Sequence, residues 1–155
     1  MKDMPRIFFE DLEVGTVETY GAYEVTEAEV IEFAAKYDPQ PFHIDHEAAK
    51  TSVFGALCAS GWHTCSMMMR LMVDHMREQG LASMGSPGID ELRWLKPVFP
   101  GETLSVTSEF INKSTSETRP NLGFAKTNFT VKNQNGEVKL TLIANSMIAR
   151  KKPGS

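Results

Sequence analysis

The sequence lacks the features that mark secreted, metal-stapled and membrane-spanning proteins. Its 155 residues include only two cysteines, Cys58 and Cys65, too few for a disulfide framework or a cysteine-based zinc site. No segment approaches the roughly 18 consecutive apolar residues that a membrane helix needs. The apolar run at residues 7–9 is also too short for a signal peptide. We therefore expect a cytoplasmic protein, and the absence of repeats and linkers indicates one domain over residues 1–155.

A strong charge of one sign is also missing. Lys and Arg total 16 against 20 Asp and Glu, which gives a formal net charge of −4. A mildly acidic chain without a basic stripe argues against nucleic acid and anionic membranes as partners. The sequence also has no P-loop, no G-x-G-x-x-G and no G-x-S-x-G, so phosphate-loop, dinucleotide and serine-hydrolase motifs are excluded.

The patterns that are present predict helices first and long strands afterwards. Thr26 and Glu29 form a capping box before an apolar helical repeat, and Asp38-Pro39 ends that helix. Helices are expected at 27–37, 46–51 and 60–79, strands at 16–24, 89–95, 103–110, 122–132 and 138–149, and loops at 38–44 and 133–136. On the longest helix, the residues expected to form a buried stripe are Trp62, Cys65, Met69, Met72 and Met76. This order indicates an α+β fold, with an antiparallel sheet curled around the long helix.

The densest polar segment is YDPQPFHIDH, at residues 37–46. Its two prolines stiffen the backbone, so Asp38 and His43 can be presented in a fixed relation. A carboxylate and an imidazole that converge on one point can hold a water between them and supply a base and an acid near neutral pH. Two alternatives stay open here. Asp38 could cap a turn while His43 packs, or His43, Asp45 and His46 could bind a metal, although no fourth ligand stands out.

A second candidate feature is the start of the longest helix, at Ser60-Gly61. A glycine there allows a ligand close to the backbone, and the free N–H groups of a helix start favour negative charge. The carbonyl oxygen of a thioester, which becomes enolate-like during reaction, would be stabilised at such a place. The alternative is a glycine that is merely tolerated beside a serine N-cap.

Together these segments resemble the MaoC-like dehydratases, which include the R-specific enoyl-CoA hydratases. The run at residues 38–43, DPQPFH, matches the family signature D-x-N-P-x-H at three of its four specified positions, with Gln40 in place of the asparagine. Gly61 stands 18 residues after His43, where the family keeps its oxyanion glycine. LKPVFPGETL at 95–104 and NQNGEV at 133–138 are similar to two further family segments. The resemblance covers about residues 8–149, and Trp62-His63-Thr64 departs from it with larger side chains.

The resemblance implies a hot-dog fold, usually paired as a homodimer, with an acyl-CoA thioester as substrate. The implied activity is a lyase that reversibly hydrates trans-2-enoyl-CoA to R-3-hydroxyacyl-CoA. Asp38, His43 and Gly61 would be catalytic, and the residues expected to bind substrate are Pro41, Phe42, Ser60 and Trp62. No metal or cofactor is implied. The alternatives are an acyl-CoA thioesterase and a non-catalytic acyl-CoA-binding module. For the dimer, strands 103–111 and 122–132 are expected to offer a pairing edge, because they contain no proline.

Overall fold

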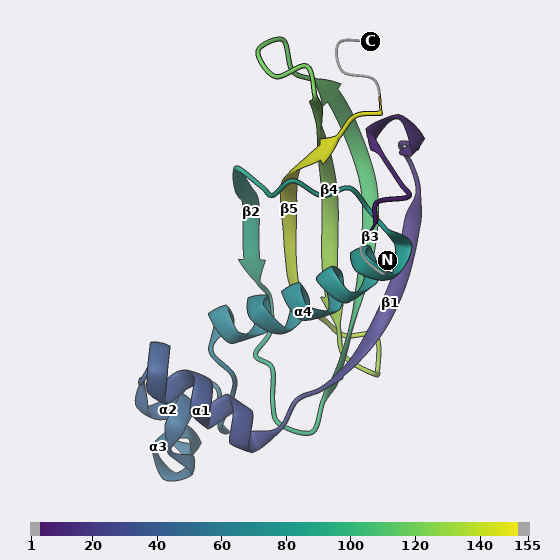
Figure 1. The fold of residues 1–155 in the computed structure, drawn as a ribbon. Helices are drawn as coiled ribbons and strands as arrows, with labels where there is room; N and C mark the ends of the chain where they lie inside the picture. The colour runs from purple at the N-terminus through teal and green to yellow at the C-terminus, as the bar shows by residue number, and fades with distance from the viewer. Residues whose placement is uncertain (1–3, 152–155) are drawn as a thin grey trace.

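The computed structural model describes residues 4–151 and shows one long helix lying across a five-stranded antiparallel sheet (Figure 1). The strands are β1 (Val17–Glu24), β2 (Gly88–Trp94), β3 (Thr103–Thr115), β4 (Leu122–Lys132) and β5 (Val138–Ala149). The helices are η1 (Phe9–Asp11), α1 (Glu27–Tyr37), α2 (Pro41–Ile44), α3 (His46–Lys50) and α4 (Gly61–Gln79). The expected α+β hot-dog arrangement is confirmed.

The strand order in the sheet is β1-β3-β4-β5-β2, so the edges are β1 and β2. The expectation that strands 103–111 and 122–132 offer a pairing edge is therefore wrong, because β3 and β4 are interior strands, paired on both sides. Each edge strand also has a register irregularity, in β1 between Tyr20 and Tyr23 and in β2 between Asp90 and Arg93. Such irregularities bend an edge and weaken it as a template for further strands.

Helix α4 begins and ends where the sequence predicts. The Ser60 side chain accepts a hydrogen bond from the N–H of Trp62, and Gly80 ends the helix in the left-handed region, with φ 76°. The buried face differs from the expected stripe, since the buried residues of α4 are His63, Thr64, Met67 and Met68. Trp62 and Met69 are 60% and 45% exposed. Met67 and Met68 lie in the main core, together with residues of the sheet.

The three other α-helices lie together beyond the N-terminal end of α4 (Figure 1). The Thr26 side chain caps α1 by accepting from the N–H of Glu29, while the Glu29 carboxylate accepts from the Tyr23 hydroxyl. The expectation of a loop over 38–44 is wrong, because Pro41 begins the short helix α2. Proline suits the first position of a helix, where its missing N–H costs no hydrogen bond. Within residues 4–151, no helix is long and apolar enough to cross a membrane.

Candidate active site

The end of α1 and the short helix α2 bring Asp38 and His43 together. Asp38 follows the last residue of α1, and its N–H donates to the carbonyl of Ala34 at 2.8 Å. His43 lies within α2 and is buried. Its Nε2 lies 3.4 Å from Oδ2 of Asp38, and the Asp38 side chain keeps 19% of its surface exposed. The α2 turn thus places the imidazole beside the carboxylate, as the spacing of the two residues predicts.

The hydrogen bond on the other side of the imidazole places a proton on one ring nitrogen. Nδ1 of His43 lies 2.6 Å from the carbonyl oxygen of Cys58. Because a carbonyl oxygen can only accept, Nδ1 carries a proton, and Nε2 is the ring nitrogen that faces Asp38. Burial raises the pKa of the Cys58 thiol to about 11, so this thiol stays protonated and is no nucleophile.

Asp38 is held as a carboxylate by its neighbours. Burial acts to raise the pKa of Asp38, but hydrogen bonds from Ser60 and Gln40 and the nearby His43 outweigh it and lower the pKa below the usual value. The Gln40 amide donates to Oδ1 of Asp38 at 2.7 Å. Gln40, which departs from the family signature, therefore orients the carboxylate directly. At neutral pH Asp38 is ionised and able to accept a proton.

A cavity of about 400 Å³ opens beside this pair. Asp38, His43, Phe42, Trp62 and Val98 are among the residues that line it. Phe42 and Trp62, two of the residues expected to bind substrate, thus lie on this cavity. The two other expected substrate-binding residues lie elsewhere. Ser60 is fully buried behind Asp38, and Pro41 is exposed to solvent outside the cavity lining.

Gly61 lies on the same cavity, at the first position of α4. The N–H of a residue at this position has no acceptor within its own helix. The structure also gives Gly61 a packing role. The Trp94 indole N–H donates to the Gly61 carbonyl at 2.8 Å, and a Cβ at position 61 would lie 2.6 Å from the indole ring. A side chain at position 61 would therefore require the Trp94 indole to move, whatever ligand the N–H meets.

The sequence and the structure have known relatives. The family model described as "MaoC like domain" matches residues 12–133. The chain belongs to the MaoC-like domain family. The crystal structure of the MaoC-like dehydratase from Rhodospirillum rubrum is 37% identical, with a TM-score of 0.85, and covers 95% of this chain and 99% of that one.

Two further similar proteins have more specific names. R-hydratase PhaJ1 from Pseudomonas aeruginosa is 25% identical, with a TM-score of 0.71, over 96% of this chain and 89% of that chain. Protein MaoC of Klebsiella aerogenes is 30% identical over 102 residues, which are 65% of this chain and 30% of that protein.

The residues considered for a metal do not converge in this MaoC-like chain. The Asp45 carboxylate accepts from the N–H of Glu47 and caps α3, and Nε2 of His46 pairs with Glu27. His43 turns inward to Asp38 and Cys58. Among residues 4–151, no three His, Cys, Asp or Glu side chains gather in a way that could hold a metal ion.

Two contacts of this MaoC-like site have no signal in the sequence pattern. One is made by the backbone carbonyl of Cys58, which a residue of any type could supply. The other is made by Trp94, which lies 33 residues from Gly61 in the sequence. Gln40 carried a signal, because it occupies the asparagine position of the family signature.

Proposed function

We propose that this protein hydrates trans-2-enoyl-CoA thioesters to R-3-hydroxyacyl-CoA and catalyses the reverse dehydration. The observation that carries the proposal is the pair formed by Asp38 and Nε2 of His43, which lie 3.4 Å apart on the wall of a cavity. A water hydrogen-bonded to both groups would direct its oxygen into the cavity. The similarity to an R-hydratase supports this reaction.

The chemistry follows from these positions. The water oxygen forms a bond to C3 of the enoyl group while one water O–H bond breaks, and the proton passes to Asp38 or His43. The same proton is then delivered to C2, so both side chains return to their starting states and the substrate gains one water. The ionised Asp38 is ready to accept a proton at the start.

The thioester oxygen gains negative charge when C3 is attacked, and we assign its stabilisation to the N–H of Gly61. This N–H stands at the start of the 19-residue helix α4, where the helix dipole adds favourable potential. The thioester itself makes C2 acidic, so the proposed reaction needs no metal and no cofactor besides the CoA of the substrate.

We also propose a cytoplasmic homodimer. Both cysteines are free thiols, as suits a reducing compartment. Around β2 and the first half of α4, the exposed large apolar residues are Trp62, Met69, Ile89, Trp94 and Leu95. A second copy would cover such a patch. A monomeric mass by light scattering at micromolar concentration would reject the dimer.

A screen of enoyl-CoA thioesters from crotonyl-CoA upward tests the reaction. Hydration removes the absorbance of the conjugated thioester, and we expect that loss with the parent protein and not with Asp38→Asn. Release of free CoA thiol at a matching rate would instead show a thioesterase. Acyl-CoA binding without turnover would show a binding module. Either result overturns the proposal.

A further inference from the structure

A buried ammonium group lies at the end of the sheet where the β4–β5 hairpin turns. Lys139, in β5, has only 2% of its side chain exposed. Its Nζ donates to the carbonyl of Pro97 at 2.9 Å and forms ion pairs with Glu102 at 2.9 Å and Glu137 at 2.7 Å. The three N–H groups of the ammonium therefore each have an acceptor, which leaves Nζ one position.

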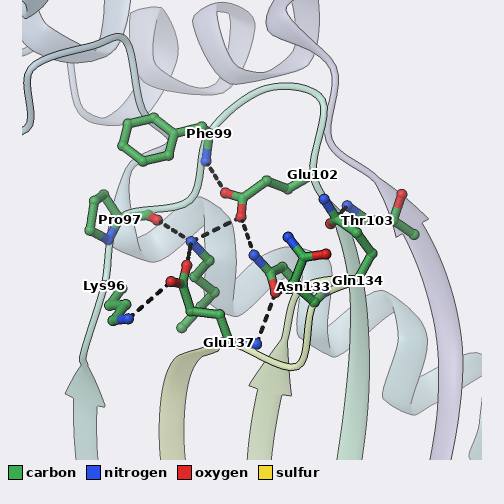
Figure 2. Close-up of polar contacts among 10 residues, drawn as sticks. Lys96, Pro97, Phe99, Glu102, Thr103, Asn133, Gln134 and Glu137 are labelled. Carbon is green, nitrogen blue, oxygen red and sulfur yellow. Dashed lines mark hydrogen bonds and ion pairs between the residues drawn. The ribbon is translucent and has the colours of Figure 1, made fainter.

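Glu102 extends this cluster to two turns of the chain (Figure 2). One carboxylate oxygen accepts from the N–H of Phe99 at 2.6 Å, and the other accepts from the Asn133 amide at 2.7 Å as well as from Lys139. Oδ1 of the Asn133 side chain in turn accepts from the N–H of Glu137 at 2.9 Å. The turn at 97–102 and the hairpin loop at 133–137 are thereby joined through charged hydrogen bonds.

From this cluster, one path of hydrogen bonds leads to His43. Val98, which follows Pro97, accepts at its carbonyl from the N–H of Ala59 at 2.8 Å. The preceding residue, Cys58, supplies the carbonyl that holds Nδ1 of His43 at 2.6 Å. The position of the 97–98 segment therefore sets the position of the group that orients the imidazole.

A second path leads to Asp38. The Glu102 carbonyl accepts from the N–H of Val25 at 2.9 Å, and the N–H of Gly101 donates to the Val25 carbonyl at 2.8 Å. Val25 is fully buried and directly precedes Thr26, the N-cap of α1. Asp38 follows the last residue of the same helix. The start of the rigid element that presents Asp38 is thus fixed by the cluster.

We infer that Lys139 and Glu102 are positioning residues that set the spacing of Asp38 and His43 through these two paths. The effect of that spacing on the rate of hydration rests on the proposed function. Replacing a buried ion pair by neutral groups is often tolerated in stability, whereas misplacement of reacting groups by about 1 Å can cost about 100-fold in rate. Neutralising the whole pair should therefore lower kcat by more than its effect on stability would explain.

The test compares two ways of weakening the same strand. Lys139→Met removes the ammonium, and Lys139→Met/Glu102→Gln also neutralises the carboxylate, so that no unpaired charge stays buried. Leu140→Ala is the matched control, because Leu140 is the next residue in β5, is fully buried in the core and faces the other side of the sheet from its neighbour in the strand. All are assayed well below their melting temperatures.

We expect the double variant to lose about tenfold or more in kcat, with KM for enoyl-CoA changed less than kcat. Leu140→Ala should lower the melting temperature at least as much and leave kcat within about threefold of the parent. Equal loss of kcat in the Leu140 control would assign the effect to general destabilisation and overturn the inference.

An NMR readout separates this inference from the proposed function. The Nδ1–H proton of His43, assigned by its absence in His43→Gln, reports the hydrogen bond to Cys58 without any substrate. It should shift in the double variant and keep its position in Leu140→Ala. A protein that hydrates no enoyl-CoA would refute the proposed function, and the His43 resonance would still decide the positioning role. An unshifted resonance in the double variant overturns it.

Discussion

Two buried polar regions of this protein, the Lys139 cluster and the candidate active site, are built in opposite ways. Around Lys139, the ammonium has three acceptors and both oxygens of Glu102 accept hydrogen bonds. At the candidate site, Asp38 and Nε2 of His43 face each other at 3.4 Å beside a cavity. In the first region the charged groups are fully hydrogen-bonded within the protein, so that the cluster is saturated. In the second, the two side chains line a cavity and can contact a bound molecule.

The difference shows which features mark a functional site. Both regions are buried, charged and tied to the backbone, so burial and charge do not separate them. A saturated network has one arrangement and serves as a fixed support. A carboxylate and an imidazole that open together on a cavity are able to hold and exchange a proton. The predictions below test this contrast, from the largest expected effect to the smallest.

The open pair should dominate activity. Asp38→Asn and His43→Gln should each lower the hydration rate by about 10²- to 10⁴-fold. The double variant should lose little beyond the worse single one, because the two groups act on the same water. Their melting temperatures should stay close to the parent, since neither change opens a core cavity. Steady-state rates with an enoyl-CoA that the parent protein hydrates measure the effect. Near-parental rates in both single variants would contradict the assignment.

Removing only one partner of the saturated cluster should also lower stability strongly. Lys139→Met leaves the Glu102 carboxylate buried with fewer partners and should cost about 3 to 5 kcal/mol of unfolding free energy. Adding Glu102→Gln should recover part of that loss, because the unpaired charge is removed. Urea unfolding of both single variants and the double variant gives the coupling between the two residues. Strictly additive losses would show that the pair does not interact as the structure indicates.

Much of the fold follows from the sequence because the strong signals are local. The bounds of β4 and β5 agree with the alternating pattern, and α1 and α4 end at the expected breakers, Asp38-Pro39 and Gly80. The exposed face of α4 could not be predicted, since methionines occur on both sides of it and periodicity does not say which side meets the sheet. Pro41 favours the expectation of a loop because proline breaks a helix in its interior, but proline also suits the first turn of a helix, where Pro41 lies.

The site was predictable only where side chains carry the chemistry. The spacing of Asp38 and His43 points to their convergence, and α2 supplies the turn that completes it. The Cys58 carbonyl and the Lys139 paths depend on backbone groups that any residue could provide. Contacts between segments distant in sequence, such as Trp94 with Gly61, depend on strand order, which the sequence pattern leaves open.

The two roles of Gly61 can be separated by a smaller change. Gly61→Ala places a methyl group against the Trp94 indole and should lower kcat/KM about tenfold by displacing the start of α4. Gly61→Ala/Trp94→Leu makes room for the methyl group, with Trp94→Leu alone as the control. If close approach of the thioester to the N–H requires glycine, the double variant stays impaired relative to that control. Recovery to the control rate would show that the glycine serves Trp94 alone.

The smallest effect concerns the outer member of the cluster, Glu137. Hydrogen bonds from Lys139 and Lys96 lower the pKa of Glu137 from 4.5 to about 2. A carboxyl group with a lowered pKa in the folded state binds protons more readily when unfolded, so it adds stability above pH 4.5 that is lost as the pH falls toward 2. Glu137→Gln should therefore lower the urea midpoint slightly at pH 7 and flatten its decline between about pH 5 and pH 2. Asp74→Asn, which removes an exposed pair with Arg70, is the control and should leave that decline unchanged. An equal flattening in both variants would show that the cluster holds Glu137 no more firmly than an ordinary surface pair.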